Sequence, residues 1–183
     1  MNRIRLLMIG IVLITGAPAA LAEDAAAPKA APQAAPQGPA EKAFAAMKTL
    51  VGTWKGTADG DATHPAELVY ALTAGGSTVM ETLFPGTEHA MVTMYHMDGK
   101  DLVLTHYCAA GNQPRMKLAA GDGSGEMKFS FAGGSNLDPG KDMHMHEASI
   151  RIVDANNLES RWVSFEAGKE AGAHSFKVAR VQS

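Results

Sequence analysis

The chain has 183 residues and a formal net charge of −3, from 16 basic and 19 acidic side chains, and its basic residues are scattered along the sequence. Nucleic acids and anionic membrane surfaces require a clustered basic footprint, so we expect neither as a partner. The single cysteine, Cys108, excludes an intramolecular disulfide. The folded part must therefore be held together by its core alone.

The N-terminal part of the chain is typical of a targeting segment followed by a linker. Residues 1–22 are predicted to be a signal peptide, because two arginines precede a short apolar stretch and Ala20-Leu21-Ala22 forms a cleavage site. The apolar stretch is too short to span a bilayer, so we expect no membrane insertion after cleavage. Residues 23–40 are mostly Ala, Pro, Gln and Gly, which predicts a disordered linker before a single domain over 41–183. A periplasmic or secreted location follows.

The folded region begins with a helical pattern and continues with strands. Residues 41–51 carry apolar side chains at helical spacing and precede Gly52, which predicts one short helix. The pattern then changes to short period-two segments separated by turn residues, which is typical of an all-β domain. Closure removes free edges, so we predict an antiparallel up-and-down β-barrel of about ten strands. The predicted strands are centred on 53–58, 66–73, 77–84, 89–97, 101–108, 114–120, 126–131, 143–153, 157–166 and 174–182.

Alternation along each predicted strand indicates which side chains point into the barrel. A tight Gly-Gly turn pairs Tyr70 with Glu81, and the carboxyl then lies on an inner face among apolar neighbours. We assign His106 to the inner face of its strand. His144 and His146 share the apolar face of their strand, so we expect both imidazoles to point inward.

The two ends of the domain carry a family resemblance. Arg180 on the last predicted strand can stack on Trp54 of the first and close the barrel. The run Leu50-Val51-Gly52-Thr53-Trp54-Lys55-Gly56, answered by Arg180, resembles the lipocalin and fatty-acid-binding superfamily, the calycins. Both termini also resemble nitrobindins, a likeness that implies haem with His174 as axial ligand. The chain as a whole is similar to uncharacterised secreted bacterial proteins of this barrel type, which implies no activity.

The inner polar side chains predict a binding role. We expect a small apolar or amphipathic molecule in the barrel interior, because such sites combine an apolar lining with a few polar groups. No local pattern of catalytic residues is recognisable, so we expect a non-enzymatic protein with no resident cofactor. The predicted ligand-binding residues are Tyr70, Glu81, His106, His144 and His146 inside the barrel, with Asn112 and Arg115 in a turn near its entrance.

Two alternatives stay open beside the haem implied by the resemblance. His144 and His146, two positions apart on one face, could place both imidazoles on a metal ion. The domain could instead be structural or accessory, with a filled interior and partners bound through a long glycine-containing loop over 132–141. No pattern in the sequence indicates an oligomeric state.

Overall fold

The computed structural model describes residues 38–119 and 125–182. The signal peptide expected over 1–22 lies outside this part of the chain, as does most of the linker expected over 23–40. The described elements are α1 (Pro39–Lys48), β1 (Gly52–Ala58), β2 (Asp61–Thr73), the short helix η1 (Ala74–Gly76), β3 (Thr78–Leu83), β4 (Met91–Asp98), β5 (Asp101–Tyr107), β6 (Gln113–Leu118), β7 (Glu126–Ser135), β8 (His144–Ile152), β9 (Asn157–Glu166) and β10 (Lys169–Arg180).

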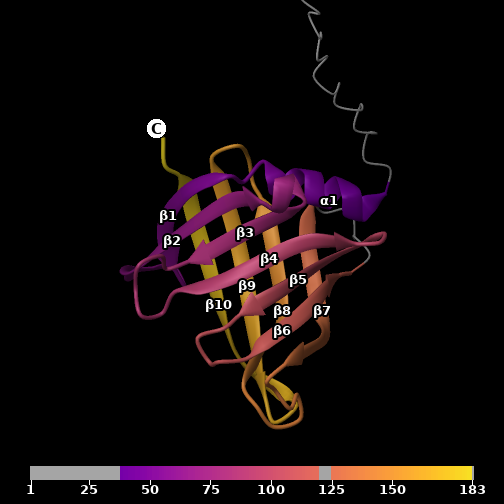
Figure 1. Cartoon of the computed structure of the whole chain (residues 1–183). Coiled ribbons are helices and arrows are strands. Elements are labelled where there is room, and N and C mark those ends of the chain that lie inside the picture. The colour runs from indigo at the N-terminus through magenta and orange to yellow at the C-terminus, as the bar shows by residue number, and fades with distance from the viewer. Residues whose placement is uncertain (1–37, 120–124, 183) are drawn as a thin grey trace, which may run out of the picture. The chain divides into compact units, whose positions relative to one another are not determined.

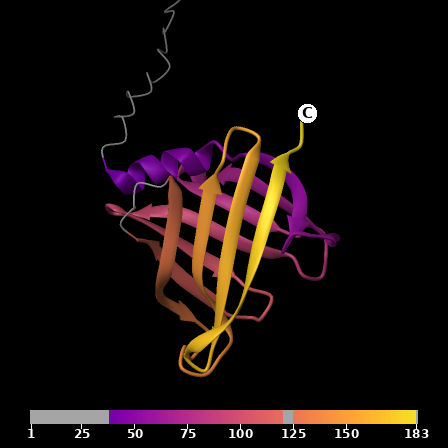
Figure 2. The same cartoon turned by 180° about the vertical axis from the view of Figure 1, so that it is seen from behind.

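The strands form a closed antiparallel barrel. Each strand pairs with its neighbours in sequence, and β1 pairs with β10 to complete the ring. Figure 1 shows the wall that contains β2, β3, β4 and β5, and Figure 2 shows β7, β8, β9 and β10 from behind. The ten-stranded up-and-down barrel with one short N-terminal helix, predicted from the sequence, is confirmed.

Two predicted contacts fix the strand register. Tyr70 lies opposite Glu81 in the β2–β3 ladder. Trp54 lies opposite Arg180 in the β1–β10 ladder, and the guanidinium carbon of Arg180 lies 4.2 Å from the centre of the indole ring. Arg180 also donates to the carbonyl oxygens of Val51, at 2.7 Å, and Thr49, at 2.8 Å. One side chain therefore stacks on the first strand and holds the segment that leads into it.

Gly56 permits the close approach of β1 and β10. A Cβ atom at this position would lie 1.9 Å from the carbonyl oxygen of Lys177 on β10, which is far inside van der Waals contact. The glycine between Trp54 and the end of β1 is thus a requirement of barrel closure.

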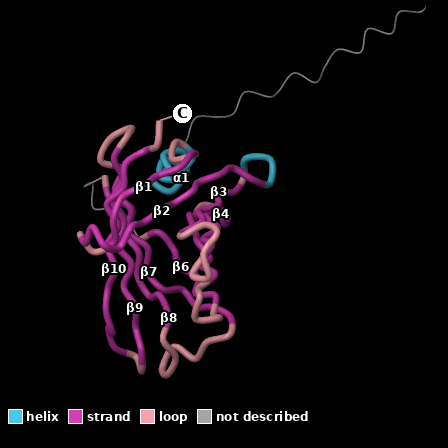
Figure 3. The backbone as a smooth tube through the Cα atoms, turned by 90° about the vertical axis from the view of Figure 1, so that its left-hand side faces the viewer, coloured by secondary structure: helices cyan, strands magenta, loops and turns pink. Residues whose placement is uncertain are grey.

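Helix α1 covers one end of the barrel, the end at which β1 begins (Figure 3). Its residues Phe44 and Met47 are buried, as is Leu50 just beyond it, and the indole N–H of Trp54 donates to the Leu50 carbonyl at 2.8 Å. This end is therefore sealed by apolar packing. No helix in the described ranges is long and apolar enough to cross a membrane.

The loop predicted over 132–141 is shorter in the structure. Strand β7 continues to Ser135 and pairs again with β6, where Pro114 lies opposite Gly134. A Cβ at Gly134 would meet the Gln113 carbonyl oxygen at 2.9 Å, so glycine here allows close strand approach. Two of the three glycines that suggested a loop, Gly133 and Gly134, belong to β7, and the connection to β8 begins only at residue 136.

Candidate ligand-binding site

A pocket of about 620 Å³ opens at the end of the barrel opposite α1. Its volume lies within the usual range for small-molecule sites. Apolar side chains from seven strands and from the connections between strands contribute most of its wall. The apolar part of the lining consists of Ala58, Pro65, Leu83, Phe84, Met91, Ala109, Ala110, Met143, Met145, Trp162 and Phe176.

Strand alternation explains why large side chains gather here. Trp162 on β9 and Phe176 on β10 occupy the inward phase of their strands, each only 4% exposed. Phe84 follows β3 with a positive φ of 53°, and its ring packs edge-on against Phe176 with centroids 6.0 Å apart. The barrel end is thus lined by rings but left unfilled.

His106 is the one predicted ligand-binding residue that lines this pocket. It lies on the inner face of β5, as the alternation predicted, and is 3% exposed. Its Nδ1 lies 2.9 Å from the Thr93 hydroxyl, and its ring packs against Trp162 with centroids 4.8 Å apart. Its Nε2 is buried without a hydrogen-bond partner among the described residues. Burial lowers the pKa of His106 to about 4, so the imidazole is neutral at pH 7.

A buried carboxyl and two phenols lie further inside the barrel. Tyr70 donates to Glu81 Oε1 at 2.9 Å, and Tyr95 donates to Glu81 Oε2 at 2.5 Å. Burial raises the pKa of the Glu81 carboxyl, and the hydrogen bonds from Tyr95 and Tyr70 act in the opposite direction. None of the three residues contributes to the pocket wall. Tyr70 and Glu81 therefore meet as predicted, but they lie behind the pocket.

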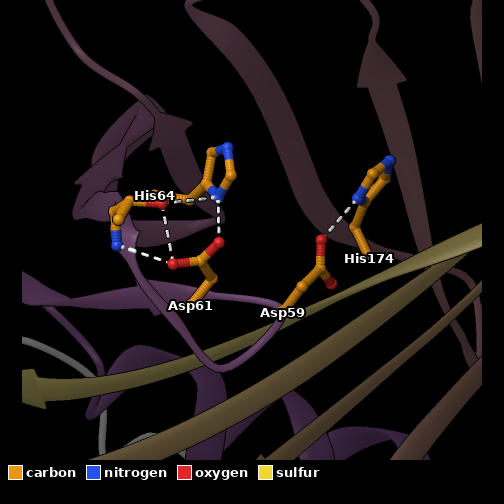
Figure 4. A network of polar contacts seen from close by, with 5 residues as sticks. Asp59, Asp61, His64 and His174 are labelled. Carbon is orange, nitrogen blue, oxygen red and sulfur yellow. Dashed lines mark hydrogen bonds and ion pairs between the residues drawn. The ribbon is translucent and has the colours of Figure 1, made fainter.

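Figure 4 shows two Asp–His pairs, of which Asp59, His64 and His174 line the pocket. His174 Nδ1 lies 2.9 Å from Asp59 Oδ2, and His64 Nδ1 lies 2.9 Å from Asp61 Oδ2. Hydrogen bonds from His174 and from the Ser175 backbone N–H lower the pKa of Asp59. Both acids belong to the β1–β2 hairpin, so one turn positions two imidazoles that border the pocket.

The two histidines of β8 occupy a different place from the one expected. A β-bulge at His146 interrupts the β8–β9 ladder, where Met145 lies opposite Ser164 and Glu147 lies opposite Val163. The bulge shifts the alternation by one residue, so Met145 lines the pocket while His144 and His146 do not. Neither imidazole therefore contributes to the wall of this pocket, although His144 is fully buried.

His144 and His146 instead form an aromatic cluster with Phe131 and Phe165. His146 stacks on Phe165 with centroids 4.0 Å apart and on Phe131 at 4.8 Å. His144 Nδ1 donates to the carbonyl of Asp142 at 2.8 Å, so its Nε2 accepts from His146 Nδ1 at 3.0 Å. The two nitrogens that face each other are therefore joined by a hydrogen bond and do not point together at a metal ion.

This arrangement does not support a metal at His144 and His146. Within residues 38–119 and 125–182, no group of three or more His, Cys, Asp and Glu side chains could hold a metal ion.

Asn112 and Arg115 lie away from the pocket wall. The Asn112 side chain is buried and donates to the Met143 carbonyl at 2.7 Å, which ties the β5–β6 turn to the start of β8. Arg115 is exposed, and its guanidinium lies 3.9 Å from the Asp98 carboxylate. The structure places Arg115 on the outward face of β6, beside the β4–β5 hairpin.

Sequence reasoning did not single out most of the pocket. His64 and His89 are exposed, yet both border the opening. Trp162 and Phe176 were assigned to strands but not to a site. Alternation predicts whether a side chain points into the barrel, but not how far along the barrel axis it lies. Trp162 and Phe176 lie well inside β9 and β10, so the pattern of neither strand marks them as part of a site.

Comparisons with known proteins add little to this geometry. No protein-family model and no curated protein matches the chain. A solved structure of a protein of unknown function from the DUF3598 family of Nostoc punctiforme PCC 73102 is similar, with a TM-score of 0.49 and 15% sequence identity. The match covers 74% of this chain and 49% of that one, so the chain spans about half of that protein's length.

Proposed function

We propose that this chain is an exported, non-enzymatic barrel that binds a small apolar or amphipathic molecule in the pocket at its open end. The observation that carries the proposal is the pocket itself: about 620 Å³ walled by aromatic and aliphatic side chains, with one buried imidazole. Filling such a space with an apolar molecule removes both partners' surfaces from water, at roughly 25 cal/mol per Å². Export is supported by the pattern of residues 1–22.

The pocket also weighs against the structural alternative. A barrel with a purely architectural role has no need for an open end lined by Trp162, Phe84 and Phe176, because side chains could fill the interior as they do beneath α1. Large apolar surfaces left accessible in a soluble domain usually serve binding.

A pocket-filling substitution tests the proposal. Met91 lines the pocket, whereas Met80 lies on the adjacent strand outside it and is similarly half-buried. We expect Met91→Trp to weaken binding of the neutral dye N-phenyl-1-naphthylamine by about five- to 150-fold, because forcing extra volume into an occupied space costs roughly 1–3 kcal/mol. Met80→Trp is the matched control and should leave the affinity unchanged. Absence of saturable dye binding, or equal weakening by both substitutions, would contradict the proposal.

The natural ligand can be sought directly by native mass spectrometry of mature protein purified from its own source. A bound mass of a few hundred daltons that is present in the wild-type protein and absent from the Met91→Trp protein would identify the ligand class. Purification of both proteins from the same cells makes the comparison internal.

Haem is a second candidate, favoured by the surroundings of His174. This residue borders the pocket, and Asp59 holds its Nδ1 at 2.9 Å, which leaves Nε2 as the remaining ring nitrogen. A carboxylate on the second nitrogen orients a metal-ligating imidazole and raises its basicity. His174 therefore suits the axial role that the nitrobindin resemblance implies. A haem held there would supply one-electron or O₂ chemistry.

Titration with haem distinguishes this candidate from the first. We expect a Soret band that His174→Ala abolishes and Asp59→Asn weakens, while His64→Ala, which removes the imidazole of the other Asp–His pair, leaves it in place. A band of equal strength in the His174→Ala protein would exclude His174 as the ligand.

A further inference from the structure

His106 lies at the floor of the pocket, where the filled part of the barrel begins. In the strand ladders Thr93 lies opposite His106 and Glu81 lies opposite Thr93, and neither of these two neighbours lines the pocket. One step along the inner face toward the open end, Leu83 and Met91 lie opposite each other, and both line it. The His106 ring therefore lies at the level where side chains stop filling the interior.

One ring nitrogen at this floor has no partner in the protein. His106 is 3% exposed, its Nδ1 lies 2.9 Å from the Thr93 hydroxyl, and no described residue offers its Nε2 a hydrogen bond. Because Nδ1 is turned toward Thr93, which does not line the pocket, the part of the ring that contributes to the wall is the part that carries Nε2. Buried polar groups in proteins nearly always have a partner, and each exception calls for an explanation.

The free nitrogen distinguishes between two ways in which a molecule can fill the pocket. An apolar group on the floor would keep water from Nε2 and offer it no hydrogen bond, so the nitrogen would be desolvated without compensation. A polar ligand atom on the floor supplies the bond. This holds whichever ring nitrogen carries the proton, since Nε2 accepts a hydrogen bond in one tautomer and donates one in the other.

The lining offers no counter-charge to an ionised group on the floor. Among the described residues that line the pocket there is no lysine or arginine, and the one carboxylate, Asp59, is already bonded to His174 and to the Ser175 backbone N–H. Burial lowers the pKa of His106 to about 4, so its imidazole is neutral at pH 7. An ion on the floor would therefore be buried without a partner, which costs far more than burying a neutral polar group.

We propose that the pocket selects an uncharged amphipathic molecule that binds with its polar end inward, a polar atom hydrogen-bonded to His106 Nε2 and the apolar body packed against Trp162 and Phe176. His106 is then the residue that determines specificity, both against hydrocarbons and against ions. This inference rests on the proposed binding function and specifies the ligand class and the orientation of the ligand.

Two probes of matched size test the polar contact. Naphthalene-2-methanol carries a hydroxyl where 2-ethylnaphthalene carries a methyl group, and a hydroxyl can hydrogen-bond to either tautomer of His106. Their dissociation constants are obtained by displacement of N-phenyl-1-naphthylamine, and the measured quantity is the ratio of the hydrocarbon's constant to that of the alcohol. We expect His106→Phe, which keeps a ring against Trp162, to lower this ratio about tenfold, the usual effect of one buried hydrogen bond.

A matched variant and a measurement on the wild-type protein separate this contact from general effects. His96→Phe makes the same exchange on the outward face of β4 and should leave the ratio unchanged. In the wild-type protein, the alcohol should shift the ¹⁵N resonance of His106 Nε2 and the hydrocarbon should shift it much less, for either tautomer. Naphthalene-2-carboxylate, an ion at neutral pH, should bind at least about tenfold more weakly than the alcohol.

The outcomes distinguish this inference from the function on which it rests. If both probes displace the dye but their ratio is the same in the wild-type and His106→Phe proteins, the pocket binds and His106 does not hold the polar end. Equal ¹⁵N shifts with the two probes, or tighter binding of the carboxylate than of the alcohol, would also overturn the inference. If neither the dye nor the probes bind, the proposed function itself fails.

Discussion

Acidification should destabilise the barrel through His106. Burial lowers the pKa of this imidazole from 6.5 to about 4. In the unfolded chain the imidazole takes up a proton near its ordinary pKa, whereas in the folded barrel it does so only near pH 4. The unfolded state therefore binds more protons between these values, and stability is lost as the pH falls through that range. One pKa unit corresponds to about 1.36 kcal/mol, so the loss reaches about 3 kcal/mol.

Comparison of the wild-type and His106→Phe proteins isolates this contribution. Urea unfolding followed by circular dichroism gives the unfolding free energy of each from about pH 7 to about pH 4. We expect the difference between the two proteins to shift by about 3 kcal/mol in favour of the variant on acidification. Glu81, whose raised pKa acts with the opposite sign, is present in both proteins, so its contribution largely cancels. A difference that stays constant over this range would refute the assignment of a buried neutral imidazole.

Three further substitutions, one of them paired with a control, test the packing and a buried hydrogen bond. Arg180→Lys keeps the charge but loses the planar fork and the stack on the first strand, so we expect a loss of about 2 kcal/mol in urea unfolding. Gly56→Ala should lower the free energy of unfolding by about 3 kcal/mol or more, or prevent folding, because the new Cβ would lie 1.9 Å from the β10 backbone. Gly172→Ala is the control: its new Cβ would lie 3.7 Å from the nearest atom, so thermal unfolding should show almost no change. Tyr95→Phe removes one hydrogen-bond donor from Glu81 and should lower the free energy of unfolding by about 1–3 kcal/mol at neutral pH. The loss should be smaller in acid, where the carboxyl is protonated, and urea unfolding at both pH values measures the difference.

The fold could be predicted because its signals are local. Period-two alternation, turn residues at short intervals and the helical spacing before Gly52 are each read within a few positions, and each agrees with the observed element. The pairing of Tyr70 with Glu81 followed from a single tight connection, because register in a hairpin is set by the residues at its turn. Trp54 and Arg180 were matched from opposite ends only because closure makes the first and last strands neighbours.

The β8 strand shows where alternation fails. One extra residue at His146 shifts every inward position on its N-terminal side, so Met145 faces the pocket in place of the histidines. The bulge in β8 arises because this strand must pair with β7 on one side and with β9 on the other. The sequence of β8 alone does not show how the two pairings fit together. The two neighbouring histidines suggested a metal site because the strand was assumed to be regular.

The sequence by itself determined the helix, the order and number of strands, the closure of the barrel and the inward face of His106, because these depend on side-chain periodicity and on neighbours along the chain. Only the tertiary structure decided that the barrel is filled at the α1 end and open at the other. It also brought Asp59 to His174, 115 residues away, and left His106 Nε2 without a partner. A cavity is the space inside the barrel that side chains from distant parts of the sequence leave unfilled, and an unpaired atom is one that those side chains do not reach. Both can be identified only when all ten strands are in place.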